Sequence, residues 1–352
     1  MAPDAPPRTG RRRPRLAPGP VDRRREGETD RLGRRAVELS RFYGGKVETV
    51  PKVPVRSLRD FALWYSPGVA EVSRAIRADP EQSFELTGRW NTVAIVTDGS
   101  RVLGLGDIGP RAALPVMEGK ALLFKFLGGV DAVPLPIRVA TPDQFLSTVE
   151  ALAPAFGGIN LEDIASPKCF GILEELSKRL DIPVWHDDQL GTAAATVAGL
   201  LNALALTGRT VRGARTVLLG AGAANLVTAR LLIALGHDPK RLTLIDQEGV
   251  LHAERDDVDE LMVRNPWKYR LALQTNGGGR TGDLAAAVPD ADVLVAASTP
   301  TPGVVRPEHI AAMARAPVVF ALANPTPRSG RARPGRRGRR SSRPVAATSR
   351  TR

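Results

Sequence analysis

Two pairs of adjacent acids are the residues whose types and spacing could do chemistry in this sequence. Glu162-Asp163 follows the apolar, glycine-broken run 155–159, and Asp187-Asp188 follows another short apolar segment, so both pairs are expected at strand ends. Carboxylates gathered at one edge repel one another, and a shared cation relieves the repulsion; Mg²⁺ and Mn²⁺ prefer such oxygen ligands. The alternative, four solvated loop acids, is not excluded by spacing alone.

A glycine-rich turn is the second candidate site. The segment Gly220-Ala-Gly-Ala-Ala-Asn225 fits G-x-G-x-x-N between an expected strand and an expected helix. Gly220 permits the tight turn, Gly222 lets the backbone approach a pyrophosphate, and the start of the helix at Ala223 and Ala224 offers free N–H groups. The third position is Asn225 rather than Gly or Ala, which either loosens the helix against the strand or adds a polar contact.

An acid at the end of the next strand bears on cofactor choice. Asp246 lies 26 residues after Gly220. In a dinucleotide-binding unit this carboxylate accepts hydrogen bonds from the ribose hydroxyls and repels a 2′-phosphate, which favours NAD over NADP. The competing interpretation is a purely structural glycine turn.

Composition is that of an ordinary soluble domain. The 352 residues are 43% hydrophobic and 25% charged, and no apolar run approaches the roughly 18 residues that span a bilayer, so no membrane association is expected. Cys169 is the only cysteine, which excludes an intrachain disulfide and favours the cytoplasm. We expect Cys169 to be a small buried side chain, and His186 to be a structural, hydrogen-bonded histidine rather than a metal ligand.

The positive charge is concentrated in two terminal arms. Residues 1–35 contain 11 Arg and 5 acids, and residues 328–352 contain 10 Arg and no acid. These arms contribute +6 and +10 to a net charge of +13, which leaves −3 for residues 36–327. Such Pro-, Gly- and Arg-rich arms are expected to be disordered. They could bind polyanions non-specifically, but no aromatic residue is interleaved to stack on bases, so no specific nucleic acid is expected.

Strands and helices alternate along the remaining chain, which predicts an α/β protein with covered parallel sheets. A hairpin is expected from strand 92–97 and the extended residues 102–103. Helix 191–206 is expected to link two domains, 36–185 and 186–327, of which the second has the β-α-β order of a dinucleotide-binding unit. The other expected helices are 57–64, 69–78, 116–125, 142–153, 167–180 and 223–235, and the other expected strands are 133–139, 154–160, 182–184, 216–220, 242–246, 292–297 and 318–323.

Six motifs in order resemble the malic enzyme family, in particular its short bacterial type. They are Tyr65-Ser-Pro-Gly-Val-Ala70, Asp98-Gly-Ser-Arg-Val-Leu-Gly-Leu-Gly-Asp-Ile-Gly109, Pro115-Val-Met-Glu-Gly-Lys120, Asn160-Leu-Glu-Asp163, His186-Asp-Asp-Gln189 and Asn324-Pro-Thr-Pro327. The resemblance runs from about residue 43 to residue 327. It implies an N-terminal malic-type α/β domain followed by a Rossmann-like domain, and the metal-dependent oxidative decarboxylation of L-malate to pyruvate and CO₂ with reduction of NAD, or less readily NADP.

The resemblance also implies roles for individual residues. Lys120 is the base for the C2 hydroxyl, provided that its pKa is lowered, and Asp187 orients it. Tyr65 is the acid that protonates C3 of enolpyruvate.

The remaining roles concern metal and substrate. Glu162, Asp163 and Asp188 hold Mg²⁺ or Mn²⁺. Arg101 grips a malate carboxylate, for which a solvated turn residue is the alternative, and Asn324 hydrogen-bonds the substrate near the nicotinamide.

The resemblance ends after Pro327, where relatives continue with more of the cofactor domain. We therefore expect an aberrant or truncated C-terminus and an incomplete second domain, which would leave apolar surface open to water or to a partner chain. Short enzymes of this family are typically homodimers. The alternative function is a non-catalytic NAD- or metabolite-binding protein whose tails bind polyanions.

Overall fold

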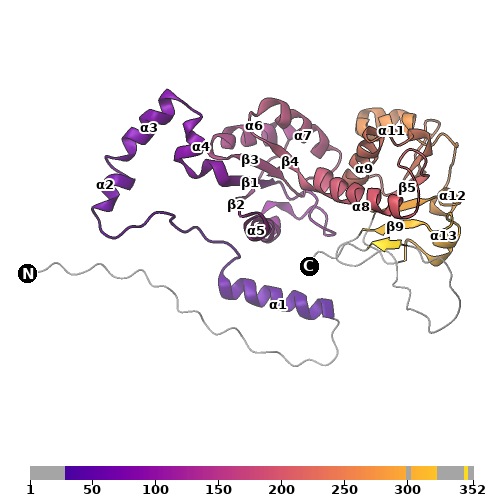
Figure 1. The fold of residues 1–352 in the computed structure, drawn as a ribbon, viewed down its shortest axis with the longest axis horizontal. Helices are drawn as coiled ribbons and strands as arrows, with labels where there is room; N and C mark the ends of the chain where they lie inside the picture. Colours follow the sequence, from indigo (N-terminus) through magenta and orange to yellow (C-terminus); the bar gives the residue numbers. More distant parts are fainter. Residues whose placement is uncertain (1–27, 299–302, 323–344, 348–352) are drawn as a thin grey trace, which may run out of the picture.

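Two mainly parallel sheets, connected by a long helix, organise the chain (Figure 1). The computed structural model describes residues 28–298, 303–322 and 345–347. The first sheet has the order β2-β1-β3-β4, with every neighbouring pair parallel. Its strands are β1 (Thr92–Thr97), β2 (Asp131–Pro136), β3 (Gly158–Leu161) and β4 (Val184–His186). The parallel α/β prediction is confirmed here.

Helices cover this first sheet. They are α5 (Gly109–Gly128), α6 (Pro142–Leu152) and α7 (Lys168–Arg179), with 3₁₀ turns η1 (Gly88–Asn91) and η2 (Ala153–Ala155). The start of α6 shows why the sequence forms a helix there: the Thr141 hydroxyl accepts the backbone N–H of Gln144, and Pro142 occupies the first turn. On its inner face, α6 buries Phe145, Leu146 and Val149.

The second sheet has the order β10-β9-β8-β5-β6-β7. Its strands are β5 (Thr216–Leu219), β6 (Leu242–Asp246), β7 (Gly249–Val250), β8 (Val293–Ala296), β9 (Val318–Ala321) and β10 (Val345–Ala347). Only the β6–β7 pair is antiparallel. The surrounding helices are α9 (Ala223–Ala234), α10 (Val258–Arg264), α11 (Pro266–Gln274), α12 (Leu284–Ala287), α13 (Pro307–Ala311) and the 3₁₀ turn η4 (Pro239–Arg241).

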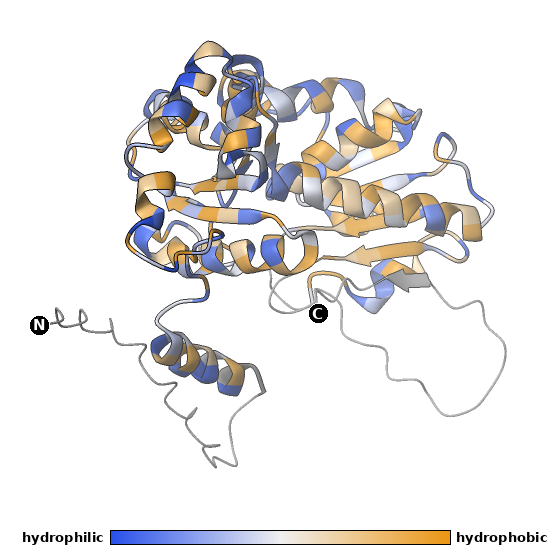
Figure 2. Ribbon diagram, turned by 60° about the vertical axis from the view of Figure 1, so that its left-hand side comes forward, coloured by the Kyte–Doolittle hydropathy of each residue, from blue (hydrophilic) through white to orange (hydrophobic). Residues whose placement is uncertain are grey.

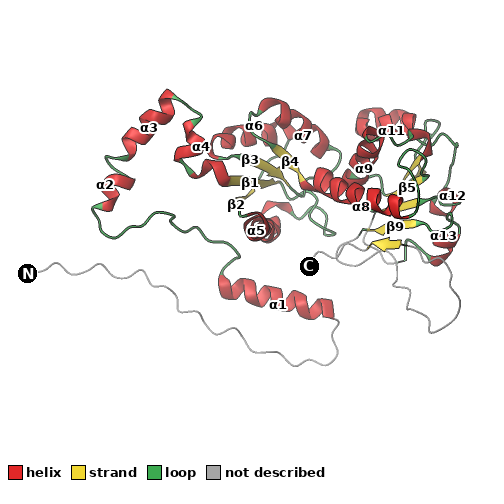
Figure 3. Cartoon of the chain, viewed as in Figure 1, coloured by secondary structure: helices red, strands yellow, loops and turns green. Residues whose placement is uncertain are grey.

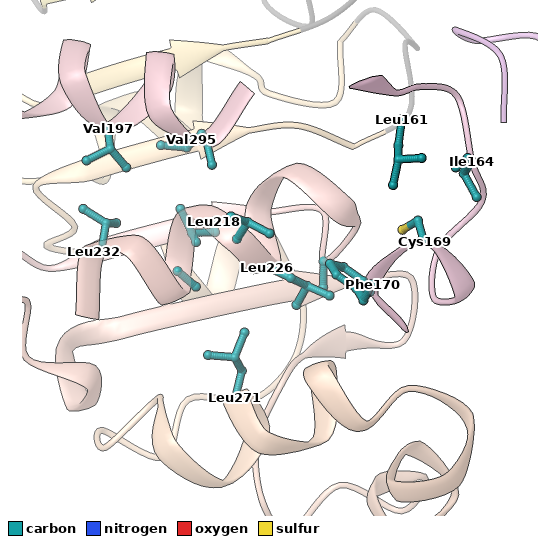
Figure 4. Packing of buried hydrophobic residues seen from close by; sticks show 14 of the residues in the cluster. Leu161, Ile164, Cys169, Phe170, Val197, Leu218, Leu226, Leu232, Leu271 and Val295 are labelled. Carbon is teal, nitrogen blue, oxygen red and sulfur yellow. The ribbon is translucent and has the colours of Figure 1, made fainter. Parts of the chain in front are cut away.

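The connecting helix joins the two units through a shared core. The π-helical turn η3 (Asp187–Gly191) leads directly into α8 (Thr192–Leu206). By length and composition the span Asp187–Leu206 could cross a bilayer, but α8 buries apolar side chains against α9 and β9, as a core helix does. Figure 4 shows residues of this continuous cluster from both units. Phe170 stacks on Trp267 with ring centroids 5.0 Å apart.

Residues 28–78 form a helical arm that extends away from the sheets (Figures 1 and 3). Its helices are α1 (Glu28–Tyr43), α2 (Asp60–Trp64) and α3 (Val69–Ala78), whereas α4 (Gln82–Leu86) returns the chain to the first sheet, where Phe84 packs against the core. Helices α2, α3 and α4 have no buried residue. Figure 2 shows hydrophobic positions along the arm as well as in the sheets. The arm therefore carries apolar surface that its own chain leaves open.

The structure differs from several expectations in detail. Residues 28–35, which were expected to belong to a disordered arm, form the first part of α1, because the apolar spacing of a helix reaches back to Leu32. No hairpin forms at 92–103: β1 is an inner parallel strand, and Val102 bridges only to Gly106. The predicted boundary at 185/186 falls inside β4. Residues 345–347 of the tail form β10 beside β9, where an open parallel edge accepts a short apolar strand.

Leu218→Ala should destabilise the protein by about 2 to 5 kcal/mol, because Leu218 is fully buried in β5 and its truncation leaves a cavity. The matched control is Leu206→Ala, at 79% exposure, for which the change should stay within about 0.5 kcal/mol. Urea unfolding followed by circular dichroism measures both. Equal midpoints for the two variants would contradict the assigned core.

Candidate functional site

Three parallel strands of the first sheet end in acids at one edge. Asp98 follows β1, Glu162 and Asp163 follow β3, and Asp187 and Asp188 follow β4. Because the carboxyl ends of parallel strands meet at the same edge, residues far apart in sequence come together there. The expectation that both acidic pairs lie at strand ends is confirmed.

Lys120 links the two acidic pairs. From α5, its Nζ lies 2.6 Å from Glu162 Oε1 and 2.6 Å from Asp187 Oδ2. The Lys120 side chain is 22% exposed and that of Glu162 is 5% exposed. Asn160 donates to Glu162 Oε2 at 3.2 Å, which satisfies the other carboxylate oxygen. The structure thus brings Lys120 and Asp187 together as the sequence predicted.

The same contacts determine the protonation of Lys120. Burial alone lowers the pKa of Lys120, but Glu162 and Asp187 outweigh burial and hold that pKa above its usual value. Burial alone therefore does not provide the lowered pKa on which the base role of Lys120 depends, because two carboxylates share the ammonium group. Burial raises the pKa of Glu162 to about 8, and the pull of Lys120 opposes this rise while the charge of Asp188 adds to it.

Asp163 and Asp188 belong to the same cluster. Asp188 Oδ2 accepts the backbone N–H of Asp163 at 2.8 Å. Burial and the charge of Asp188 raise the pKa of Asp163 to about 7, and burial raises that of Asp188. Asp163 has φ 54°, a strained value for a residue with a side chain, and its carbonyl accepts the backbone N–H of Arg101 at 3.0 Å.

The donor chemistry of this cluster fits a divalent cation. Asp163 Oδ2 is buried and lacks a hydrogen-bond partner within the described part of the chain. Glu162 and Asp188 supply further carboxylates, and hard cations prefer such oxygens. However, no group of three or more His, Cys, Asp or Glu among the described residues has the arrangement of a preformed metal site. One reason is visible: Lys120 occupies Glu162 Oε1.

Residues beside the cluster are held by packing. Gly191 ends η3, and a Cβ there would lie 2.0 Å from Asp187 Oδ1, so any side chain would displace Asp187. Burial lowers the pKa of His186 to about 4, and within the described chain neither ring nitrogen has a hydrogen-bond partner. The expected hydrogen-bonded role of His186 is therefore wrong. Cys169 is buried, as expected, and burial raises the pKa of its thiol to about 12.

Of the other predicted substrate and catalytic residues, Arg101 adjoins this cluster only through its backbone N–H, which donates to the Asp163 carbonyl. Tyr65 caps α2 in the arm and is 72% exposed. Arg101 has an exposed side chain in the turn after β1. Asn324 lies outside the described residues.

The glycine turn has the expected strand–turn–helix setting. Gly220 follows β5 with φ 98°, and a Cβ there would lie 2.5 Å from the carbonyl oxygen of Ala297. Gly222 precedes α9, which begins with Ala223 and Ala224. Asn225 is buried and donates its amide to the carbonyls of Leu219 and Gly220, at 3.0 and 2.8 Å. Asn225 therefore adds a polar contact between helix and turn, one of the two alternatives left open.

Asp246 ends β6 as predicted, but its carboxylate is fully engaged. Oδ1 accepts from Arg255 at 2.8 Å and from the backbone N–H of Glu248 at 3.0 Å. Oδ2 accepts from Arg255 at 3.1 Å and from Lys268 at 2.8 Å. A carboxylate has about four acceptor positions, so none is left for ribose hydroxyls in this arrangement. Sequence reasoning missed Arg255 and Lys268, although Arg255 stands only nine residues after Asp246.

Fold and site together define a class: a two-domain α/β protein in which a Lys-bridged carboxylate cluster adjoins a dinucleotide-type turn. Comparison with known proteins specifies the family. Residues 44–142 match the family described as "Malic enzyme, N-terminal domain", and residues 190–334 match "Malic enzyme, NAD binding domain". The chain belongs to the malic enzyme family.

Individual relatives agree with this assignment. The NAD-dependent malic enzyme of Geobacillus stearothermophilus is 46% identical over 81% of this chain and 57% of its own length. The NADP-dependent malic enzyme of Halomonas elongata is 46% identical over 80% of this chain and 64% of its own length. The bifunctional malic/malolactic enzyme of Bacillus subtilis is 44% identical over 84% of this chain and 70% of its own length. This chain thus spans less than two thirds of the first two relatives.

Solved structures give the same result. The NAD-dependent malic enzyme of Thermotoga maritima superposes with a TM-score of 0.78 at 44% identity, covering 84% of this chain and 76% of that one. The malic enzyme of Entamoeba histolytica superposes with a TM-score of 0.81 at 42% identity, covering 85% of this chain and 63% of that one.

Asp246→Asn should destabilise the fold by about 3 kcal/mol at pH 7, because it removes the carboxylate that pairs Lys268, at a side chain 17% exposed, and leaves Arg255, 9% exposed, paired with Asp257 alone. Its cations hold the pKa of Asp246 below the usual value despite burial. The wild-type advantage is therefore full above the unfolded-state pKa of about 3.9 and is lost as pH falls through the lower folded-state pKa.

Denaturant titrations at pH 7 and at low pH measure this difference. Asp256→Asn, at a neighbouring exposed acid, is the matched control and should have little effect. If Asp246→Asn were as stable as the control at pH 7, Asp246 would not anchor the two cations.

Proposed function

We propose that this protein catalyses the oxidative decarboxylation of L-malate to pyruvate and CO₂ in the cytoplasm, with a nicotinamide dinucleotide as oxidant and Mg²⁺ or Mn²⁺ as the metal. The observation that carries the proposal is the position of Lys120 between Glu162 and Asp187. The turn η3, which contains Asp187 and Asp188, packs against α9, the helix that follows the dinucleotide turn. The carboxylate cluster and the cofactor turn thus adjoin.

The residues of the cluster fit the steps of this reaction. Lys120 Nζ would take the proton of the C2 hydroxyl, and a nicotinamide bound beside the glycine turn would supply the acceptor for the C2 hydride. The bond between C3 and the departing carboxylate then breaks, and C3 is protonated by Tyr65. Asp187, hydrogen-bonded to Lys120, orients it. Arg101 and Asn324 are the proposed substrate-binding residues, in keeping with the family motifs.

A divalent cation held by Glu162, Asp163 and Asp188 would polarise the C2 oxygen and add a positive charge that lowers the pKa of Lys120. Lys120 must lose its proton before it can act as a base. Of the two carboxylates that pair with the Lys120 ammonium in the present arrangement, Glu162 is one that such an ion would engage. The buried Asp163 Oδ2, which has no hydrogen-bond partner among the described residues, supports this assignment.

We further propose a homodimer in which the arm of one copy completes the site of the other. Tyr65 is exposed in its own chain, and its neighbours Leu58, Leu63 and Trp64 are 85%, 63% and 45% exposed. Short helices that bury nothing gain stability chiefly from packing against a partner. A second copy would cover this apolar surface and receive Tyr65 beside its Lys120.

NAD remains the proposed cofactor, with limited discrimination against NADP. Repulsion of a 2′-phosphate by Asp246 was the basis for this preference. Arg255 and Lys268 neutralise that carboxylate, so the repulsion is weakened. We expect kcat/KM to favour NAD by less than about tenfold, equivalent to about 1.4 kcal/mol.

A coupled assay of the purified chain tests the reaction. NADH formation and pyruvate release should be stoichiometric, should require Mn²⁺ or Mg²⁺, and should stop with a chelator. Lys120→Ala should lower kcat at least about 10²-fold, because it removes the base, while the circular dichroism spectrum is retained. Binding of NAD without malate turnover at any metal concentration would instead favour a non-catalytic metabolite-binding protein.

Mixing two inactive variants tests the shared site. Lys120→Ala and Tyr65→Phe should each be inactive, because each lacks one partner of the proton transfer. After unfolding and refolding at equal amounts, half of the dimers are mixed and each mixed dimer has one intact site, so activity should return to about one quarter of wild type. Refolded single variants are the controls. Absence of recovery, with wild type refolding normally, would place Lys120 and Tyr65 of the same chain in one site.

A further inference from the structure

A cavity of about 380 Å³ lies at the amino ends of β5 and β6. Thr216, the first residue of β5, and Thr243 of β6 form part of its wall. The cavity lies at the opposite ends of these strands from Gly220 and Asp246. Strands rise roughly 3.3 Å per residue, so the length of β5 separates the cavity from the glycine turn. It is therefore distinct from the cofactor-binding turn and from the carboxylate cluster.

Four cations line this cavity and one acid accompanies them. They are Arg215, Lys240, Arg241 and Arg280, and the acid is Asp238. Asp238 is engaged in capping η4, where its Oδ1 accepts the backbone N–H of Lys240 at 3.0 Å. None of the four cations forms an ion pair with a carboxylate among the described residues. The charge of the lining is thus strongly positive and is not neutralised locally.

Two of the guanidinium groups are held in place by carbonyls. Arg241 donates to the carbonyl of Gly213 at 3.0 Å. Arg280 donates to the carbonyls of Ala286, Ala287 and Pro289 at 3.2, 3.1 and 2.9 Å. Carbonyls fix the orientation of a guanidinium without cancelling its charge. Each group therefore keeps donors for an anion, and pre-ordering reduces the entropy lost on binding.

We infer that this cavity, defined by Arg215, Lys240, Arg241 and Arg280, is an anion-binding site for a compact polyphosphate group. Guanidinium forks bind phosphate oxygens bidentately, and lysine adds a point charge. The cavity volume is within the range of small-ligand sites, and several cations around it match several phosphate charges better than one carboxylate. The inference does not depend on the proposed reaction.

Calorimetric titration of the full chain with inorganic tripolyphosphate, in metal-free buffer at fixed ionic strength, tests the site. Saturable binding of one tripolyphosphate per chain is expected. Lys240→Gln/Arg241→Gln should weaken it at least tenfold. Inorganic phosphate should bind more weakly than tripolyphosphate, since it engages fewer cations.

The Arg-rich termini require a control of equal charge. Arg77→Gln/Arg270→Gln removes two exposed cations elsewhere and should leave the affinity within twofold. Equal weakening in both double variants, or multiple weak equivalents that neither alters, would assign binding to general positive charge and overturn the site. Absence of saturable binding to folded wild type would overturn it as well. Since no malate, metal or nicotinamide is present, these outcomes are independent of catalytic activity.

Discussion

The repulsion among carboxylates at the edge of the first sheet is the constraint on which the site depends. Glu162, Asp187 and Asp188 are brought together because β3 and β4 are parallel neighbours. The positive charge of Lys120 offsets this repulsion, because its Nζ contacts one acid from the end of each strand. The same arrangement explains why Gly191 cannot carry a side chain, and why Asp163 takes a strained backbone: both keep acids within the cluster. A reaction that moves protons and negative charge needs such a responsive set of groups.

Much of the fold could be predicted because the signals were local. Short apolar runs gave β1, β5 and β6 close to their observed bounds, and helical spacing gave α6, whereas β3 begins four residues later than expected because residues 153–155 form a 3₁₀ turn. Pairing was harder. The turn after β1 suggested a hairpin, yet β1 pairs with β2 and β3, which are distant in sequence. The choice between a hairpin and a parallel crossover is made by tertiary packing, which local propensity does not contain.

The site shows the same division between local and long-range information. Motifs predicted that Lys120 and Asp187 act together, and their side chains are hydrogen-bonded at 2.6 Å. The motifs did not reveal that the Asp246 carboxylate accepts hydrogen bonds from Arg255 and Lys268. Neither partner is adjacent to Asp246 in sequence: a loop separates Arg255 from it, and helix α10 also precedes Lys268. Tyr65 is a further case: in the proposed homodimer it would act in the site of the partner, so contacts within its own chain do not reveal that position.

The polarity of parallel sheets also explains why two unlike sites can exist in one chain. Every strand of a parallel sheet presents its carboxyl end to one edge and its amino end to the other. In the first sheet the carboxyl edge collects acids, where a cation and a lysine can offset their charge. In the second, the amino ends of β5 and β6 collect arginines whose orientation is fixed by carbonyls rather than by acids. Positive charge remains in excess around the cavity because four cations face one acid, Asp238, and an anion from solution can compensate that excess.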